Sequence, residues 1–332
     1  MEACVKAAVI KEAGQLDVEA VAIPKPAEKE VRLKIQLAGI CGSDNSVYHG
    51  KLPAYFPIIP GHEAIGIVEA LGVSANRFQI GQRVTIHPNY FCGHCPPCQK
   101  GMTNVCRSKV RLGIDCNGVF AEYATIPEAA LYPLPANLTD RVAVFAEPLA
   151  VAAHAMRLVP VQSEDRVLIF GAGVIGQLTL QLARLKSRHI TACDLVSSRL
   201  DLARRMGAEQ TIGDQESMTA SEASFDVIFE TSGAPAGLEM AIQLAAPGAK
   251  IVLLGIPGES HPVSTVQIVR KELQIFGSMI YTDEFEQSIE LLASGQVKAE
   301  PLISGVIPLE QLQENLENFS APQRMKTLVK IP

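Results

Sequence analysis

The stretch RVLIFGAGVIG at residues 166–176 decides the fold of the second half of the chain. Its apolar first half has the pattern of a buried strand, and a helical pattern follows its three glycines, Gly171, Gly173 and Gly176. In G-x-G-x-x-G spacing the first glycine permits a tight turn, the second lets the backbone approach a pyrophosphate, and the third lets the helix pack closely on the strand. The helix N-terminus then favours the negative phosphate charge. The stretch therefore predicts a strand–turn–helix unit that binds a dinucleotide.

Residues after this turn indicate which dinucleotide is bound. Val174 and Ile175 stand between the second and third glycines, and we expect them to contribute to the same site. Asp194 ends the next expected strand, 18 residues after Gly176, where a carboxylate can accept hydrogen bonds from the adenosine ribose and repel a 2′-phosphate. NAD is therefore favoured over NADP. Arg199 leaves two interpretations open, a contact with the adenine end of the cofactor or an ordinary solvated helix position.

Strand and helix patterns alternate from about residue 163 to residue 280. Parallel strands need a crossover connection, usually a helix, so this alternation predicts an α/β fold with a doubly wound parallel sheet of the Rossmann type at residues 151–281. In SSRLDLARRMGA we expect a serine to cap the helix and Gly207 to end it, and we expect the helix in AGLEMAIQLAAPG to end at Pro247. The strands are expected at 166–171, 189–194, 210–213, 226–233, 250–255 and 273–278.

The first 150 residues have a different pattern, with short β-like runs such as VRLKIQLAGI and RVTIHP broken by glycine and proline. They predict a mainly β domain with long loops. The segment 282–332 predicts two amphipathic helices, the second opening at Pro308, and a final strand, TLVKIP, that could return to the first domain. The expected apolar faces are Phe285, Ile289 and Leu292 for the first helix, and Leu309, Leu312, Leu316 and Phe319 for the second.

Composition excludes several classes of function. A net charge of −6 over 332 residues argues against a nucleic-acid partner, which would call for a basic face. The uncharged run at 167–183 is slightly short for a membrane span and contains the glycine motif, so no membrane partner is expected. The opening MEACVK lacks the layout of a secretory signal, and eight cysteines without such a signal fit a reducing, cytoplasmic location.

A compact group of cysteines in FCGHCPPCQKGMTNVC predicts a metal site. Its C-x2-C-x2-C-x7-C spacing suits a tetrahedral zinc ion with no open position, which would hold a lobe at about 88–107 together without doing chemistry. The alternative is an iron–sulfur cluster, but the bacterial ferredoxin run has a three-residue last gap followed by proline, and here Arg107 follows. The four predicted ligands are Cys92, Cys95, Cys98 and Cys106.

A second set of residues of the metal-binding type is dispersed along the first domain. Cys41 lies in GICGSD, His62 and Glu63 lie in GHEAIGIVEALG, and Glu147 lies in FAEPLAVAAHA. Each has an ordinary interpretation by itself, since a buried cysteine behaves as a small hydrophobe and a lone histidine is often part of the core. Their spacing alone leaves open whether they converge.

These motifs, the four-cysteine lobe and FGAGVIG follow one another in the order of the zinc-dependent medium-chain alcohol dehydrogenases, which the chain resembles nearly end to end. It is most similar to the polyol (sorbitol-type) and threonine dehydrogenase branch, where a glutamate before proline, as Glu147, replaces a cysteine. The resemblance implies a GroES-like catalytic domain at 1–150 and a second, catalytic zinc held by Cys41, His62 and Glu147, with Glu63 as an alternative or exchanging ligand. It also implies a homodimer or homotetramer.

The resemblance also assigns roles to two residues that follow Cys41. Ser43 corresponds to the hydroxyl that relays the alcohol proton, and Asp44 to the carboxylate that hydrogen-bonds the zinc-ligating histidine. Without the resemblance, both would be interpreted as turn-forming polar residues. The chain departs from the family pattern at Ser46, where many members have a histidine, and at Ile280, where sorbitol dehydrogenases have an arginine. Sorbitol itself is therefore a less secure expectation.

The predicted function is the NAD-dependent oxidation of a secondary hydroxyl of a polyol, sugar acid or similar small alcohol to a ketone. A zinc-bound alkoxide would pass a hydride to C4 of the nicotinamide. We expect Tyr48, Phe120 and Tyr281 to shape the substrate pocket. An L-threonine-type amino-alcohol dehydrogenase is the alternative among enzymes. A catalytically idle, NAD-binding regulatory protein is the alternative from another class, and the complete set of predicted ligands argues against it.

Overall fold

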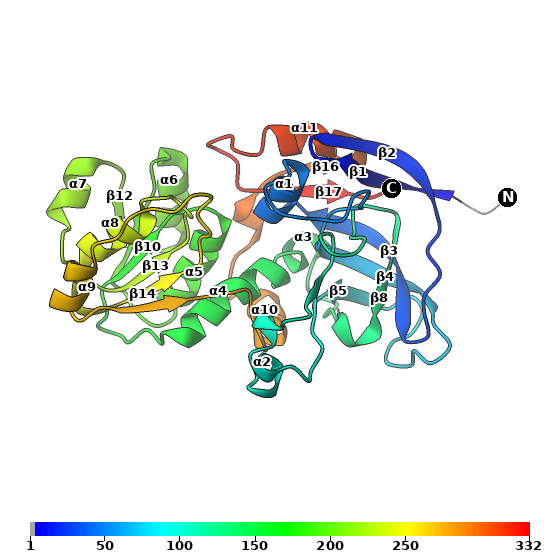
Figure 1. The fold of residues 1–332 in the computed structure, drawn as a ribbon, viewed down its shortest axis with the longest axis horizontal. Helices are drawn as coiled ribbons and strands as arrows, with labels where there is room; N and C mark the ends of the chain where they lie inside the picture. Colours follow the sequence, from blue (N-terminus) through cyan, green and yellow to red (C-terminus); the bar gives the residue numbers. More distant parts are fainter. Residues whose placement is uncertain (1–3) are drawn as a thin grey trace. The chain divides into compact units, whose positions relative to one another are not determined.

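The computed structural model describes residues 4–332, so the first three residues of MEACVK lie outside it, and the chain forms two compact units (Figure 1). The first unit contains the residues up to Glu147, together with Ile289–Ser294 and Ile303–Pro332. The second contains Pro148–Ser288 and Gly295–Leu302. The C-terminal segment, for which we predicted a return to the first domain from residue 282, is therefore shared between the two units.

The first unit is built on a seven-stranded, largely antiparallel sheet. The strand order is β16-β17-β3-β4-β5-β9, and β8 pairs with the first half of β3 on the edge opposite β4. A hairpin of β1 and β2 and a two-stranded β6–β7 ribbon complete the unit. Its strands are β1 (Cys4–Glu12), β2 (Gln15–Ala22), β3 (Glu30–Gly39), β4 (Glu63–Leu71), β5 (Arg83–Ile86), β6 (Asn89–Tyr90), β7 (Val110–Arg111), β8 (Tyr123–Pro127), β9 (Leu131–Pro133), β16 (Ile303–Pro308) and β17 (Lys326–Lys330).

Alternate residues of β3 form the centre of the apolar core, because side chains of a strand point to opposite faces in turn. Val31, Leu33 and Ile35 are fully buried there. The helical segments of this unit are short, and α4 begins in its last residues and continues in the second unit. They are α1 (Gly42–Tyr48), α2 (Pro96–Gln99), η1 (Thr103–Val105), η2 (Glu128–Ala130), α3 (Asp140–Ala143), α4 (Ala146–Leu158), η4 (Leu309–Gln311) and α11 (Leu312–Glu317).

The C-terminal residues follow the predicted pattern only in part. The final strand β17 does pair with β3, with Leu328 opposite Gly39, so it returns to the first unit. The second amphipathic helix is shorter than predicted, since a 3-10 turn comes before α11 and Phe319 lies beyond its end. The strand β16 was not predicted, because its alternating half-buried pattern ends in a proline.

The second unit has a six-stranded sheet whose strands all pair in parallel, in the order β12-β11-β10-β13-β14-β15. Counted from β10, this is the order 3-2-1-4-5-6 of a Rossmann fold. The predicted doubly wound sheet is confirmed. The elements are β10 (Val167–Phe170), α5 (Val174–Arg184), β11 (Ile190–Cys193), α6 (Ser197–Met206), β12 (Gln210–Ile212), α7 (Gln215–Ala220), β13 (Phe225–Glu230), α8 (Gly237–Leu244), β14 (Ala245–Leu253), α9 (Thr265–Arg270), β15 (Gln274–Gly277) and η3 (Glu300–Leu302). The helix α10 (Glu284–Ala293) begins in this unit and ends in the first.

Both faces of this sheet are buried, as the near-continuous apolar strands require. Val167 and Ile169 of β10 belong to an apolar cluster with residues of α5 and α6, whereas Leu168 and Phe170 belong to a second cluster with residues of α8. The chain therefore buries alternate residues of one strand in two separate cores. No helix within residues 4–332 is long and apolar enough to cross a membrane.

Two local predictions in this unit were wrong. The N-cap of α6 is Val196 and not a serine, and no side chain caps the helix; Oδ1 of Asp194 accepts the Val196 N–H at 2.9 Å, just before the first turn. Gly207 ends this helix as predicted, with a φ of 110° that suits glycine. The helix α8 ends at Leu244 and leads directly into β14, so it does not reach Pro247.

Candidate active site

Asp44 joins the two backbone segments that carry the first predicted zinc ligands. Cys41 is the N-cap of α1, and its N–H donates to Oδ2 of Asp44 at 2.8 Å. Oδ1 of the same carboxylate accepts the N–H of Gly61 at 3.2 Å, next to His62. Asp44 is buried, so both contacts are shielded from water. The predicted position of Asp44 beside the histidine is therefore what the structure shows.

The imidazole of His62 is held between two polar side chains. Oδ1 of Asp44 lies 3.3 Å from Nδ1, and the Ser43 hydroxyl lies 3.5 Å from Nε2. Burial lowers the pKa of His62, but the carboxylate of Asp44 and the thiol of Cys41 outweigh it and raise that pKa well above its usual value. The surroundings thus favour a positive charge on the Nε2 side of the ring, and a metal cation bound there would supply it.

Three of the four residues predicted for the catalytic zinc come together. One ligand atom each from Cys41, His62 and Glu63 lie within 4.8 Å of one another. Thiolate, imidazole and carboxylate are the donors that zinc takes in proteins, so the set fits this metal. Glu147 is buried in the first turn of α4, and its charge acts on Lys326 beside this cluster.

Sequence reasoning missed Lys326, the first residue of β17. Its Nζ lies 2.7 Å from each carboxylate oxygen of Glu63 and donates to the carbonyl of Ile40 at 3.2 Å. The side chains of Lys326 and Glu63 are only 4% and 1% exposed. Burial lowers the pKa of Lys326, but Glu63 and Cys41 outweigh it, and that pKa is raised. The signal that could have found Lys326 is the return of the final strand beside β3, which ends next to Cys41.

The four cysteines of the lobe also converge. The β6–β7 ribbon pairs the two chain segments on either side of the lobe. The Sγ–Sγ distances are 3.4 Å between Cys95 and Cys98, 3.6 Å between Cys92 and Cys106, and 3.9 Å between Cys95 and Cys106. Four sulfurs at ~2.3 Å from a tetrahedral zinc would be about 3.8 Å apart, so the cluster fits a closed zinc site.

Backbone amides support thiolates in this lobe. N–H groups of Arg107 and Cys98 lower the pKa of Cys95 to about 6, and the N–H of Cys92 lowers the pKa of Cys106. Burial raises the pKa of Cys98 to about 12 in the absence of a metal charge. A cation at the centre would stabilise all four sulfurs as thiolates, which is the form that binds zinc.

The glycines of the dinucleotide motif have the spacing and the contacts that the sequence predicts. Gly171 has a φ of 99°, and a Cβ on it would lie 2.7 Å from the Ser232 nitrogen. A Cβ on Gly176 would lie 1.9 Å from the Gly171 carbonyl oxygen, so only glycine lets the helix pack here. Around Gly173 nothing lies within 4 Å of such a Cβ, which leaves room for a pyrophosphate.

A cavity of about 390 Å³ opens beside this turn. Gly171, Gly173, Asp194 and Arg199 line it, whereas Val174 and Ile175, the first residues of α5, are half-buried and are not among its lining residues. The Asp194 carboxylate accepts the Ala172 N–H at 2.8 Å, and Nη1 of Arg199 lies 3.5 Å from it. Asp194 and Arg199 thus present opposite charges to the same cavity.

The aromatic residues predicted to shape a substrate pocket are buried side chains. Tyr48 donates a hydrogen bond to the Gly14 carbonyl at 2.9 Å and contacts Glu317 at 3.0 Å. Phe120 packs against Gly61, where an added Cβ would lie 2.7 Å from its ring, and Tyr281 is only 2% exposed. All three side chains are almost fully buried, and their part in shaping a substrate pocket stays a prediction.

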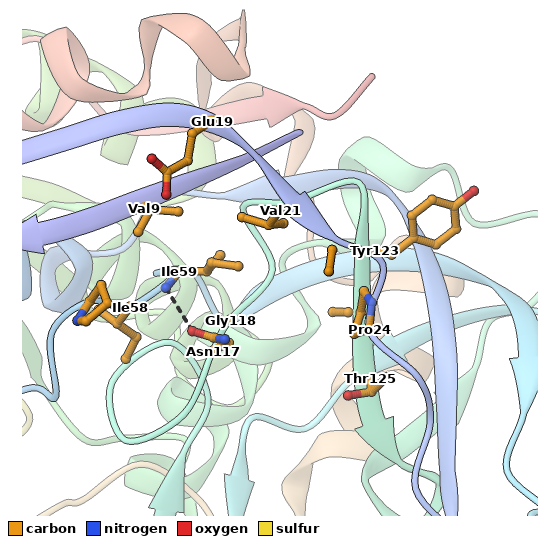
Figure 2. A pocket seen from close by; sticks show the side chains of 13 residues that line it. Val9, Glu19, Val21, Pro24, Ile58, Ile59, Asn117, Gly118, Tyr123 and Thr125 are labelled. Carbon is orange, nitrogen blue, oxygen red and sulfur yellow. Dashed lines mark hydrogen bonds between the residues drawn. The ribbon is translucent and has the colours of Figure 1, made fainter. Parts of the chain in front are cut away.

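A second hollow of about 320 Å³ lies between the β1–β2 hairpin and β8 (Figure 2). Val9, Val21 and Ile59 form its apolar part, and Oδ1 of Asn117 accepts the Ile59 N–H at 3.1 Å. Glu19, which also lines it, is paired with Lys11 at 2.9 Å. None of the predicted catalytic residues lines this hollow, so the Cys41–His62–Glu63 cluster is the candidate active site.

Comparison with known proteins agrees with this geometry. The family model of the alcohol dehydrogenase GroES-like domain matches residues 27–136, and that of the zinc-binding dehydrogenases matches residues 174–294. Starvation-sensing protein RspB of Escherichia coli strain K12 is 33% identical over 327 residues, which cover 96% of this chain and 96% of that protein. The chain belongs to the zinc-dependent medium-chain alcohol dehydrogenase superfamily.

Two further relatives of this dehydrogenase have named substrates. A 2-dehydro-3-deoxy-L-galactonate 5-dehydrogenase of Pseudoalteromonas atlantica is 32% identical over 314 residues, 92% of this chain and 92% of that protein. A sorbitol dehydrogenase of Bacillus subtilis is 31% identical over 326 residues, 94% of this chain and 92% of that protein. The predicted superfamily and a zinc-dependent alcohol or polyol dehydrogenase activity are confirmed.

Solved structures resemble the dehydrogenase over its whole length. A zinc-binding dehydrogenase of Sinorhizobium meliloti bound to NADP has a TM-score of 0.95 and 32% identity, covering 99% of this chain and 100% of that one. The rspB protein of Escherichia coli CFT073, complexed with NADH, has a TM-score of 0.92 and 32% identity, covering 98% and 99%. The predicted combination of a GroES-like domain and a Rossmann sheet is confirmed, and zinc and a nicotinamide dinucleotide are the cofactors of this superfamily.

Proposed function

We propose that this dehydrogenase oxidises a secondary hydroxyl of a polyol, a sugar acid or a similar small alcohol to a ketone, with NAD as the hydride acceptor. The observation that carries the proposal is the convergence of Cys41, His62 and Glu63, with the Ser43 hydroxyl 3.5 Å from Nε2 of His62. The names of the relatives, a dehydrogenase of a sugar acid and a sorbitol dehydrogenase, support this substrate class.

Cys41, His62 and Glu147 would hold the catalytic zinc, with Glu63 as the alternative or exchanging ligand. Zinc, when bound there, supplies the Lewis acidity that makes an alcohol hydroxyl acidic enough to ionise near neutral pH. Asp44 orients the imidazole through Nδ1, so Nε2 remains available to the metal. A second zinc would be structural and held by the four cysteines of the lobe, whose sulfur spacing leaves no position for a substrate.

Ser43 would accept the proton of the alcohol, because its hydroxyl lies on the metal-facing side of His62. Ser46, where many family members have a histidine, does not extend this relay, since its hydroxyl donates to the Gly42 carbonyl at 3.1 Å. The proton would therefore pass from Ser43 to a group outside α1, in contrast to members with a histidine at this position.

Gly171, Gly173 and Gly176 would hold the pyrophosphate of NAD at the start of α5, with Val174 and Ile175 supplying backbone N–H groups of the helix N-terminus. Asp194 would accept hydrogen bonds from the adenosine ribose and disfavour a 2′-phosphate. Arg199, close to Asp194, would offset part of that repulsion. NADP is therefore expected to bind more weakly than NAD without being fully excluded.

The proposal includes an assembly as a homodimer or homotetramer and a cytoplasmic location, in which the clustered cysteines remain thiolates for metals. The proposal includes no nucleic-acid or membrane partner. The substrate partner would be a small polyol or sugar-derived molecule.

A substrate panel followed at the NADH absorbance tests the proposal. The panel contains polyols, aldonic acids and deoxy sugar acids, L-threonine and simple secondary alcohols, each with NAD and with NADP, and zinc is counted per chain. We expect two zinc ions and turnover of a polyol or sugar acid with NAD. Turnover of threonine alone would replace the proposal by an amino-alcohol dehydrogenase. Binding of NADH without turnover of any alcohol, in a chain that holds only the lobe zinc, would favour an idle regulatory protein.

A further inference from the structure

Lys326 is the only lysine or arginine among the buried charged residues of the described chain. It lies where acidic groups gather. Its ammonium group is 2.7 Å from both oxygens of Glu63, and Cys41 and Glu147 are close enough to act on its charge. A cation at this position competes with a metal ion for the same carboxylates.

The hydrogen bonds of Lys326 are complete. An ammonium group has three N–H donors, and here they have three acceptors, the two oxygens of Glu63 and the Ile40 carbonyl. If Glu63 turned toward a metal, two of these donors would lose their partner in a place that water barely reaches. An unpaired buried charge is strongly unfavourable, so the pair resists separation.

The backbone of β3 also fixes Glu63. A Cβ on Gly39 would lie 2.3 Å from Oε2 of Glu63 and 2.9 Å from Cγ1 of Val144. The carboxylate therefore fills the space that a side chain at position 39 would need. One oxygen of Glu63 lies within 4.8 Å of ligand atoms of Cys41 and His62, so the carboxylate is within reach of a metal, but packing against Gly39 and pairing with Lys326 oppose its transfer to that metal.

We infer that Lys326 is a positioning residue that keeps Glu63 out of the metal coordination sphere and leaves the carboxylate ligand position to Glu147. The inference deepens the proposed function and rests on its catalytic zinc. A divalent cation with one thiolate and one carboxylate already has no net charge, and the Lys326–Glu63 pair neutralises itself. A metal bound by these ligands would thus keep an open position and would not gain a third anionic ligand.

Cobalt(II) substitution in the full chain tests the inference, because the visible d–d absorption of Co²⁺ reports its coordination number. Wild-type protein, Glu63→Gln and Glu147→Gln are compared, with Co²⁺ release to a chelator measured alongside. We expect the spectrum of Glu63→Gln to match the wild type and that of Glu147→Gln to change. A Glu63→Gln spectrum that changes as much as that of Glu147→Gln would overturn the inference.

Lys326→Met gives the complementary result. Without the ammonium group, Glu63 is free to bind the metal. We therefore expect the weaker d–d absorption that marks a higher coordination number, at least tenfold slower Co²⁺ release and a lower kcat. The double variant Lys326→Met/Glu63→Gln should return to the wild-type spectrum, and Lys330→Met, at an exposed position of the same strand, should leave it unchanged. If Lys326→Met does not fold, the two glutamate variants decide.

The outcomes separate this inference from the proposed function. If the wild-type chain binds only the lobe metal, both the proposed function and this inference are wrong. If it binds two metals and turns over an alcohol, but the Lys326→Met spectrum is identical to that of the wild type, only the inference is wrong.

Discussion

The carboxylate of Asp44 lies 3.3 Å from Nδ1 of His62 and accepts backbone N–H groups from both segments that carry the metal-type residues. A single buried side chain thus orients the imidazole and sets the distance between Cys41 and His62. This dual role explains why the residue is an aspartate, since a carboxylate offers enough acceptor positions for three contacts.

Replacing Asp44 by alanine should therefore weaken the catalytic metal site more than the fold. We expect a 10–100-fold loss of metal affinity, as for other partners of metal-bound histidines, and a fall in bound zinc from two ions toward one per chain. Zinc analysis after dialysis measures this loss. Asp17→Ala, which removes an exposed partner of Lys11, serves as control and should keep both ions. Full zinc content in Asp44→Ala would contradict the role assigned to Asp44.

The features that sequence reasoning predicted well depend on local patterns. The G-x-G-x-x-G turn, the alternation of strands and helices, and the cysteine lobe are each contained in a short segment, and all three are present as predicted. Each glycine and each cysteine has few other uses at that spacing. Local spacing was therefore enough to predict these structures.

The features that sequence reasoning missed depend on contacts between residues that are far apart in the sequence. Lys326 is 263 residues away from Glu63 in the chain, so no spacing rule connects them. A lysine at the start of a strand has the pattern of a surface residue until the strand pairing with β3 is known. Pairing of β17 with β3 brings Lys326 to Glu63, and the sequence near Lys326 contains no local signal for this pairing.

The second and third glycines of the dinucleotide motif should respond differently to alanine. Gly176→Ala places a Cβ against the Gly171 carbonyl, so we expect the unfolding temperature to fall by several degrees. Gly173→Ala meets no atom within 4 Å and should leave the unfolding temperature nearly unchanged, while the KM for NAD rises about tenfold because the Cβ occupies the expected pyrophosphate position. Thermal melts and NAD titrations measure both effects. Equal destabilisation by the two changes would refute this distinction.

Loss of one sulfur ligand should open the lobe. Cys98 is buried and lies 3.4 Å from Cys95. In Cys98→Ser we expect loss of one zinc per chain and a lower unfolding temperature or aggregation, since structural zinc contributes ~10–16 kcal/mol of apparent binding free energy in finger peptides. Zinc analysis and thermal melts are the measurements. Cys4→Ser, at an exposed position outside the lobe, is the control and should resemble the wild type. A Cys98→Ser protein with two zinc ions and native stability would argue against a zinc lobe.

His87 should make the stability of the chain depend on pH. It follows β5, is buried, and its Nδ1 accepts the Asn89 N–H at 3.3 Å. Burial lowers its pKa to about 4, whereas an unfolded histidine has a pKa of about 6.5. Between these pH values the unfolded chain binds a proton that the folded chain does not. The contribution of His87 to the free energy of unfolding is therefore complete above pH ~6.5 and falls by up to about 3 kcal/mol as the pH drops to 4.

In His87→Gln this contribution is absent, so its unfolding temperature should fall less than that of the wild type between pH 7 and pH 4.5. Thermal melts at both pH values test this, with the exposed His261→Gln as the control that should follow the wild type. Parallel pH profiles of His87→Gln and the wild type would show that His87 does not titrate in this way.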